Sequence, residues 1–204
     1  MNKTLTTLAA VLVTASAFAL HAEAEVLKVG EAAPAFTLTG ADGKEHNLSD
    51  FKGKYVVLEW TNFGCPFVKK FYSNGDMQAL QAKYTGKEVI WLSICSSAPG
   101  KQGHCNQEAA AKTVADHEAA ATAYLMDEDG TVGKSYGAKT TPHIFIVGPD
   151  QNLVYQGAID SIRSTNAADI SKAENYISKT LDTAMAGGAV DPATTPAYGC
   201  GVKY

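Results

Sequence analysis

Cys65 is the residue of this chain best placed for chemistry. It follows an apolar run, residues 55–60, that predicts a strand, and it precedes Pro66, which suits the first position of a helix because its missing N–H costs nothing there. The pattern predicts Cys65 as the helix cap, with its sulfur at the positive end of the helix dipole. Lys69 and Lys70 add positive charge one turn further on. These surroundings favour a nucleophilic thiolate over the alternative, a buried structural thiol.

Strands that alternate with helices are predicted to position this cysteine. The predicted strands are residues 55–60, 88–95, 123–126, 143–147 and 153–156. Helical spacing is found at residues 67–72, 77–84, 107–117 and 170–184. Residues 148–152 have turn composition and predict a hairpin. This order indicates an α/β fold with a central mixed sheet flanked by helices.

Composition and charge exclude several classes of function. The chain has 204 residues, with 17 Lys+Arg against 21 Asp+Glu, and no basic cluster, which argues against a nucleic-acid partner. Its four cysteines are too few for a disulfide scaffold and too scattered for a paired zinc site. A phosphate loop is incomplete because Glu128 stands where it needs glycine, and Asp127-x-Asp129-Gly130 lacks the terminal Glu of a calcium loop. We therefore expect no cofactor and no metal.

The first 24 residues predict a secretory signal peptide. Lys3 precedes an apolar stretch over residues 5–20, and Ala22-Glu23-Ala24 forms a small-x-small cleavage site. The alternative, a membrane anchor, is disfavoured because the run is short and no later run reaches the ~18 residues of a membrane span. We expect an exported protein, periplasmic or secreted, without stable membrane insertion after cleavage. The remainder divides into one domain, 25–188, and a tail, 189–204, that carries Cys200.

Several motifs together resemble the thioredoxin-fold redoxins. The group includes the alkyl-hydroperoxide-reductase/thiol-specific-antioxidant (AhpC/TSA) peroxiredoxins and thioredoxin-like exported oxidoreductases. The resemblance covers roughly residues 26–159, and it rests on Gly30, Pro34, Phe36, Leu38, Asp42-Gly43, Leu48, Phe51-Lys-Gly53, Cys65-Pro-Phe-Val-Lys69 and Thr141-Pro142. It implies a thioredoxin-like domain over 25–188, with an N-terminal β extension and an extended C-terminal tail.

The resemblance also implies roles for two residues. Cys65 matches the peroxidatic, or N-terminal redox, cysteine, and Pro142 matches the cis-proline that lies against it. The Thr141-Pro142 segment is then expected to offer an unpaired backbone edge to a bound chain or peroxide.

Two departures from the resemblance concern the residues around Cys65. Val68 stands where a thioredoxin's C-x-x-C motif has its second cysteine, so the local dithiol cycle is missing. A standard peroxiredoxin has P-x-x-x-T-x-x-C, but here Leu58 and Asn62 occupy the proline and threonine positions. Thr61 or Asn62 would have to activate the peroxide instead.

The topology of this fold brings the loop 158–164 to the edge of the sheet that carries Cys65. The loop contains Arg163, the only arginine of the chain. A peroxiredoxin holds its thiolate and polarises peroxide with an arginine, so Arg163 is a positional candidate for that role. The alternative is a solvated loop charge.

The partner of Cys65 in an oxidised protein is predicted to be Cys200. Cys95 ends a strand and cannot travel, and Cys105 opens a helix and is close enough to Cys95 to be tied to it. Cys200 lies on a tail long enough to reach Cys65, and two-cysteine peroxiredoxins also resolve with a C-terminal cysteine. Cys95 and Cys105 remain rivals, they can also form a structural disulfide, and Cys200 can alternatively tie the tail to the body.

The leading functional hypothesis is an exported peroxidase and antioxidant that reduces hydroperoxides through Cys65, with an external, thioredoxin-like thiol reductant. The alternative is a thiol–disulfide exchange protein that acts on exported protein disulfides. A second alternative is a non-catalytic redoxin-fold binding module. Monomers and oligomers are both compatible with the sequence.

Overall fold

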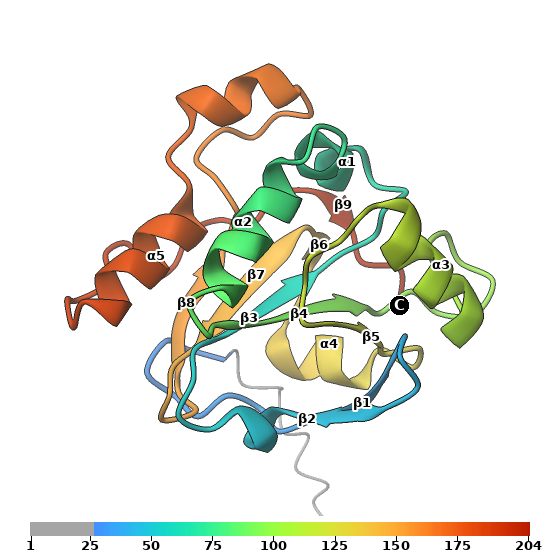
Figure 1. The fold of residues 1–204 in the computed structure, drawn as a ribbon, viewed down its shortest axis with the longest axis horizontal. Helices are drawn as coiled ribbons and strands as arrows, with labels where there is room; N and C mark the ends of the chain where they lie inside the picture. The colour runs from blue at the N-terminus through green and yellow to red at the C-terminus, as the bar shows by residue number, and fades with distance from the viewer. Residues whose placement is uncertain (1–26) are drawn as a thin grey trace, which may run out of the picture.

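The computed structural model describes residues 27–204, so the predicted signal peptide, 1–24, lies outside the described residues. A mixed sheet of seven strands forms the centre, in the order β2-β1-β5-β4-β3-β7-β8 (Figure 1). Its strands are β1 (Thr37–Gly40), β2 (Glu45–Asn47), β3 (Val56–Trp60), β4 (Ile90–Cys95), β5 (Ala123–Met126), β7 (His143–Val147) and β8 (Leu153–Gly157). A second, two-stranded sheet joins β6 (Thr140–Thr141) to β9 (Cys200–Gly201).

Helices cover both faces of the sheet. The α-helices are α1 (Pro66–Tyr72), α2 (Asp76–Thr85), α3 (Gln107–Asp116), α4 (Thr131–Tyr136) and α5 (Tyr176–Met185), and two 3₁₀ helices span Leu48–Phe51 and Ala167–Lys172. Figure 1 shows α1, α2 and α5 on one side of the sheet and α4 on the other. Within residues 27–204, none of the helices is long and apolar enough to cross a membrane.

The central strand β3 explains why the sheet needs cover on both faces. All five of its residues are buried. Val57 faces the core under α1, α2 and α5, whereas Val56 and Leu58 face the core under α4. Strand β3 pairs in parallel with β4 and antiparallel with β7. The carboxyl end of β3, the carboxyl end of β4 and the start of β7 therefore meet at one edge, as predicted from the sequence.

Two features of the fold differ from the sequence predictions. The single helix predicted over 170–184 is wrong, because the chain is extended at Ala173 and α5 begins only at Tyr176. The Asn175 side chain caps α5 by accepting the Ser178 N–H at 2.8 Å, which fixes the later start. Helix α4 was not predicted; it follows a left-handed Gly130 and is too short to show a period.

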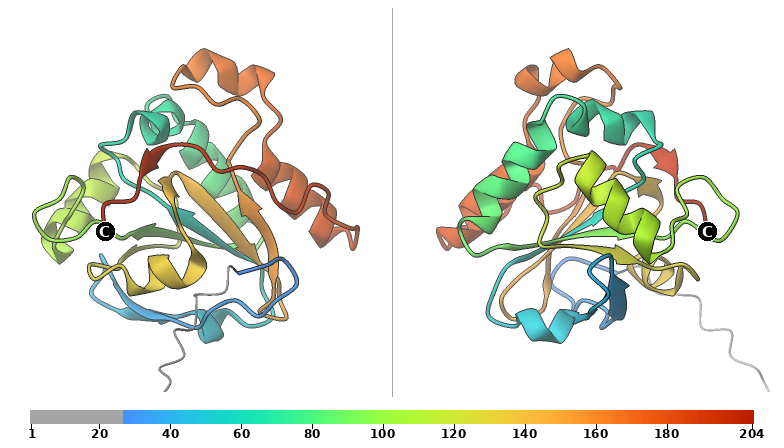
Figure 2. Two further views of the ribbon diagram at one scale, coloured as in Figure 1. Left: turned by 180° about the vertical axis from the view of Figure 1, so that it is seen from behind. Right: turned by 45° about the vertical axis from the view of Figure 1, so that its right-hand side comes forward.

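The C-terminal tail returns to the middle of the molecule after α5. Figure 2 (left) shows this red segment running back across the molecule from the end of α5. Near its end it forms β9, whose Cys200 is the register partner of Thr141 in β6. The tail therefore places Cys200 beside the segment that precedes Pro142.

Candidate active site: the Cys65–Cys200 pair

Cys65 occupies the N-cap of α1, with Pro66 in the first turn, as the sequence predicts. The turn before it is closed by a hydrogen bond from the Cys65 N–H to the Asn62 carbonyl at 2.8 Å. The residue is 1% exposed. Its sulfur therefore lies at the end of a helix where unpaired backbone N–H groups favour negative charge.

The Thr141–Pro142 peptide bond is cis, as the resemblance implies. The Cys65 thiol donates a hydrogen bond to the Thr141 carbonyl at 3.0 Å, so this segment lies directly against the cysteine. The expected unpaired edge is wrong, however, because β9 of the chain itself pairs with β6 there. The edge is already occupied by the tail that carries Cys200.

The structure brings the Cys65 and Cys200 sulfur atoms to 2.6 Å from each other. An S–S bond measures about 2.05 Å, so a disulfide needs only a small closing movement. Cys200 is partly exposed, whereas Cys65 is buried. The pair thus has an inner sulfur at the helix and an outer sulfur on the tail.

The two sulfurs differ in acidity. Burial raises the pKa of the Cys65 thiol, but hydrogen bonds from the Cys200 thiol and the Val68 N–H outweigh burial, so the pKa lies below its ordinary value. Burial and the neighbouring Cys65 raise the pKa of Cys200 to about 11. Cys65 is therefore the more acidic thiol of the pair, and Cys200 the less acidic one.

Glycine allows the tail to approach this closely. A Cβ on Gly199 would lie 2.2 Å from the Thr141 carbonyl oxygen, and the residue has a φ of +153°. Further along, the Val202 N–H donates to the Lys139 carbonyl at 3.1 Å and the Tyr204 hydroxyl to the Ala138 carbonyl at 2.8 Å. These two hydrogen bonds hold the tail after Cys200.

A buried ionic cluster anchors the tail just before Cys200. The Lys70 ammonium and the Asp160 carboxylate are 2.7 Å apart, with side chains 0% and 2% exposed. The Tyr198 hydroxyl donates to the same carboxylate. Lys70 also donates to the Ile162 carbonyl at 3.0 Å. Helix α1, the loop after β8 and the tail therefore meet at one desolvated ion pair.

This cluster revises the predicted roles of the charged residues. The loop 158–164 does reach the Cys65 edge, through Lys70. Arg163 is exposed, and no hydrogen bond or ion pair of its side chain is found among the described residues. Lys69 is likewise exposed, so the buried cation is the next residue, Lys70. A thiolate-holding role for Arg163 stays a prediction.

Thr61 and Asn62 are buried and lie close to Cys65 in sequence, but within residues 27–204 neither side chain bonds to its sulfur. The Asn62 side chain accepts the Gly64 N–H at 2.9 Å and donates to the Gln102 carbonyl at 3.0 Å, so it holds the turn and the neighbouring loop. The Thr61 hydroxyl is buried with no hydrogen-bond partner among the described residues. Neither forms a hydrogen bond with the Cys65 sulfur in the described structure, and their peroxide-activating role stays a prediction.

Glu59 is a buried carboxylate that the sequence analysis did not single out. It is 0% exposed and accepts hydrogen bonds from Trp91 at 2.8 Å and from Tyr72 at 3.0 Å. Desolvation raises the pKa of this carboxyl group, against those hydrogen bonds. The signal was present in the sequence, since Glu59 is the one charge inside the apolar run Tyr55–Trp60.

The remaining cysteines and histidines do not join this pair. The Cys95 thiol donates to the Gly103 carbonyl at 3.3 Å, and the Cys105 sulfur lies 4.0 Å from the Tyr124 hydroxyl. His143, the register partner of Trp60, is kept neutral by burial, which lowers its pKa to about 4. Within residues 27–204, no cluster of three or more His, Cys, Asp or Glu side chains could hold a metal.

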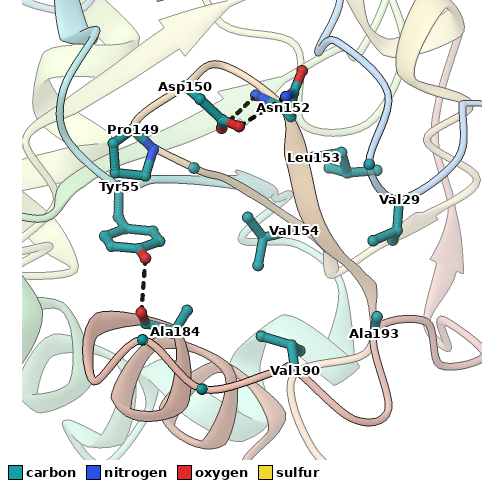
Figure 3. A pocket seen from close by; sticks show the side chains of 14 residues that line it. Val29, Tyr55, Pro149, Asp150, Asn152, Leu153, Val154, Ala184, Val190 and Ala193 are labelled. Carbon is teal, nitrogen blue, oxygen red and sulfur yellow. Dashed lines mark hydrogen bonds between the residues drawn. The ribbon is translucent and has the colours of Figure 1, made fainter.

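A large pocket lies away from the cysteines. Its volume is about 540 Å³, and Figure 3 shows Tyr55 on one side, where its hydroxyl donates to the Ala184 carbonyl at 2.9 Å, and Val29 and Val154 across from it. No cysteine or histidine lines it. It therefore adds nothing to thiol chemistry.

A buried cysteine at a helix N-terminus, beside a cis-proline on a mixed sheet of this order, is the arrangement of thiol-based redox proteins of the thioredoxin fold. Solved structures agree. An uncharacterized conserved protein from Geobacillus kaustophilus is 28% identical with a TM-score of 0.78, covering 88% of this chain and 94% of that one. A putative thiol:disulfide interchange protein DsbE from Chlorobium tepidum is 26% identical with a TM-score of 0.53, covering 64% and 84%.

The AhpC/TSA family model matches residues 29–156, and the chain belongs to that family. Among characterised relatives, the thiol-disulfide oxidoreductase ResA of Bacillus subtilis is 26% identical over 136 residues, which is 67% of this chain and 70% of ResA. The predicted fold class and family are thereby confirmed.

Proposed function

We propose that this protein is an extracytoplasmic thiol–disulfide oxidoreductase that exchanges disulfides with other polypeptides through Cys65 and Cys200. The observation that carries the proposal is the position of the pair. Cys65 is the acidic thiol at the start of α1, and its partner arrives on a strand paired with β6. The likeness to ResA and to DsbE supports the same activity.

The backbone edge of β6 is where a substrate chain would bind. A polypeptide can add to an exposed strand edge through main-chain hydrogen bonds. Strand β9 occupies that edge over only two residues, Cys200 and Gly201, and a substrate strand displaces a short partner more easily than a long one. Displacement would carry Cys200 away from Cys65 and expose the nucleophile to the substrate disulfide.

The exchange proceeds in two balanced steps. The Cys65 thiolate attacks one sulfur of the substrate disulfide; that S–S bond breaks, a mixed disulfide forms, and the other substrate sulfur leaves as a thiolate. Cys200 loses its proton to solvent or to that thiolate and attacks the Cys65 sulfur. The substrate leaves as a dithiol and the protein is left with a Cys65–Cys200 disulfide, which an external dithiol reduces.

The hydroperoxide peroxidase expected first from the sequence receives less support. The family description keeps it in view. Against it, the Asn62 side chain is engaged with Gly64 and Gln102, and Arg163 is exposed. Peroxide reduction is therefore the second candidate function.

One preparation tests both functions. Turnover of a protein disulfide with dithiothreitol is compared with consumption of hydrogen peroxide, for the wild type and for Cys65→Ser. We expect Cys65-dependent reduction of the protein disulfide and slow peroxide consumption. Rapid, Cys65-dependent peroxide consumption without disulfide turnover would overturn the proposal in favour of the peroxidase. Absence of both activities in folded protein would favour a binding module.

Export is part of the proposal and rests on residues 1–24. The test is N-terminal sequencing of protein recovered from outside the cytoplasm of a bacterial host, which should begin at Glu25. Recovery of the uncut chain from the cytoplasm alone would contradict export and leave the thiol chemistry untouched.

A further inference from the structure

Cys95 and Cys105 form a second pair of facing thiols, on a different loop from the first pair. Cys95 is the last residue of β4 and is 4% exposed, whereas Cys105 is half-buried and directly precedes the N-cap of α3. Cys105 packs against the buried cluster that contains Cys95. Cys95 also donates to the Gly103 carbonyl at 3.3 Å, and the Tyr124 hydroxyl lies 4.0 Å from the Cys105 sulfur. The loop between them is folded so that its ends meet.

The two sulfurs of this pair differ in character. The hydrogen bond from Cys105 and the Ser97 N–H lower the pKa of Cys95 to about 6, against its burial. The same contact and burial raise the pKa of Cys105. Cys95 is thus the sulfur that best carries negative charge, and Cys105 the one that holds the proton. In a disulfide between them, Cys95 would be the better leaving group.

Only the outer sulfur of the pair reaches a pocket. A pocket of about 430 Å³ is lined by Cys105, His104, His117 and Tyr124, and by Lys69 in the last turn of α1. Phe63 forms part of its wall and stacks on His117, with ring centroids 4.0 Å apart. Cys95 does not line it. The volume is within the ~300–1,000 Å³ usual for small-molecule pockets.

The geometry points to a second thiol/disulfide couple, Cys95–Cys105, that reacts through this pocket with low-molecular-weight thiols of about tripeptide size. A polypeptide has no strand edge to pair with at this position, since β4 lies between β3 and β5 inside the sheet. The side chains around the pocket include Lys69, His104 and His117, with Glu128 3.7 Å from His104. The Lys69 ammonium suits a thiol that carries a carboxylate.

The reaction balances with two small thiols. The first, as thiolate, attacks the Cys105 sulfur of the disulfide; the S–S bond to Cys95 breaks, and Cys95 leaves as the thiolate. The second small thiolate attacks the outer sulfur of the mixed disulfide on Cys105. A small-molecule disulfide leaves, Cys105 takes a proton, and the protein has gained two electrons as a dithiol.

The test isolates this pair in the Cys65→Ser/Cys200→Ser variant. Oxidised glutathione should convert it to a Cys95–Cys105 disulfide, identified by non-reducing peptide mapping, and reduced glutathione should restore both thiols. Mapping of the wild type with all four cysteines present gives the same answer if the double variant folds poorly. A folded protein in which excess oxidised glutathione leaves Cys95 and Cys105 unbridged would overturn the proposal.

Two further variants in that background test the assignment of the sulfurs. With Cys95→Ser added, glutathione should remain on Cys105 as a stable mixed disulfide. With Cys105→Ser added, the buried Cys95 should take up glutathione more than about tenfold more slowly. If Cys95 took up glutathione as fast as Cys105 or faster, the pocket route would be overturned. It would also be overturned if a thioredoxin-sized dithiol reduced the Cys95–Cys105 bridge faster than glutathione at equal thiol concentration.

Discussion

The two cysteine pairs of this protein are built alike and presented differently. In each, a buried sulfur of lowered pKa faces a partner of raised pKa. Cys65 and Cys200 are 135 positions apart and meet only because the tail returns, whereas Cys95 and Cys105 lie at the two ends of one loop. The first pair lies where β9 pairs with β6, the edge at which we propose that a polypeptide binds, whereas Cys105 of the second pair lines a pocket. Access, more than acidity, distinguishes the two.

The largest effect expected is on turnover, and it separates the pairs. Cys200→Ser removes the sulfur that releases the substrate, so exchange should stop at a mixed disulfide on Cys65. The measurement is the amount of covalent adduct with a protein disulfide on non-reducing gels. Ala189→Ser, an exposed position at the start of the same tail, is the matched control and should trap none. Cys105→Ser should not trap this adduct either, since Cys65 and Cys200 remain; if it does, the roles of the pairs are reversed.

The next effect is on stability, through the ion pair that anchors the tail. Lys70→Met leaves the Asp160 carboxylate buried without its cation, which should cost about 3–5 kcal/mol in the free energy of unfolding. Lys69→Met, the exposed neighbour, should change it by less than about 0.5 kcal/mol. Urea unfolding of the reduced proteins measures both. If Lys70→Met and Lys69→Met lowered the free energy of unfolding by the same small amount, the cluster would not hold the tail.

A smaller effect is expected on the redox equilibrium of the first pair alone. Gly199→Ala places a Cβ against the Thr141 carbonyl oxygen and should push Cys200 away from Cys65. The Cys65–Cys200 disulfide should become roughly tenfold easier to reduce, or about 30 mV. Gly201→Ala is the matched control, because nothing lies within 4 Å of its Cβ position. Redox titration in glutathione buffers gives both values, and an unchanged potential in Gly199→Ala would mean that the tail does not need this close approach.

The smallest effect is a pH shift. In the reduced protein, alkylation of Cys65 by iodoacetamide should rise with pH as the thiolate forms, with a midpoint below the ~8.5 of a free cysteine. Cys200→Ala removes the hydrogen bond that contributes most to lowering the Cys65 pKa, so the midpoint should move upward. Peptide mass analysis follows Cys65 separately from the other thiols. A wild-type midpoint at or above ~8.5 would contradict the helix-cap argument.

Local chemistry made part of this site predictable. The strand before Cys65, the proline after it and the helix that follows are encoded within a few residues, so the N-cap position could be derived. The meeting of the β3 and β4 ends with the start of β7 follows from the topology expected of the fold.

The rest depends on contacts distant in sequence. Strand β9 has two residues and no period, so its pairing with β6 leaves no mark in the sequence, and the edge was expected to be free. The choice of Lys70 over Lys69 as the buried cation depends on the phase of α1 relative to Asp160, 90 positions away. Tyr198, which ties the tail to that carboxylate, is likewise visible only once the chain is folded.

Disulfide mapping tests the central claim most directly, namely that Cys65 and Cys200 form the redox pair for polypeptide substrates. The wild-type protein is reduced, exposed to one equivalent of a protein disulfide, quenched with acid and digested without reductant. We expect a peptide that joins Cys65 to Cys200 and that is absent before the protein disulfide is added. A bridge from Cys65 to Cys95 or Cys105, or a Cys200 that stays free while Cys65 is oxidised, would contradict it.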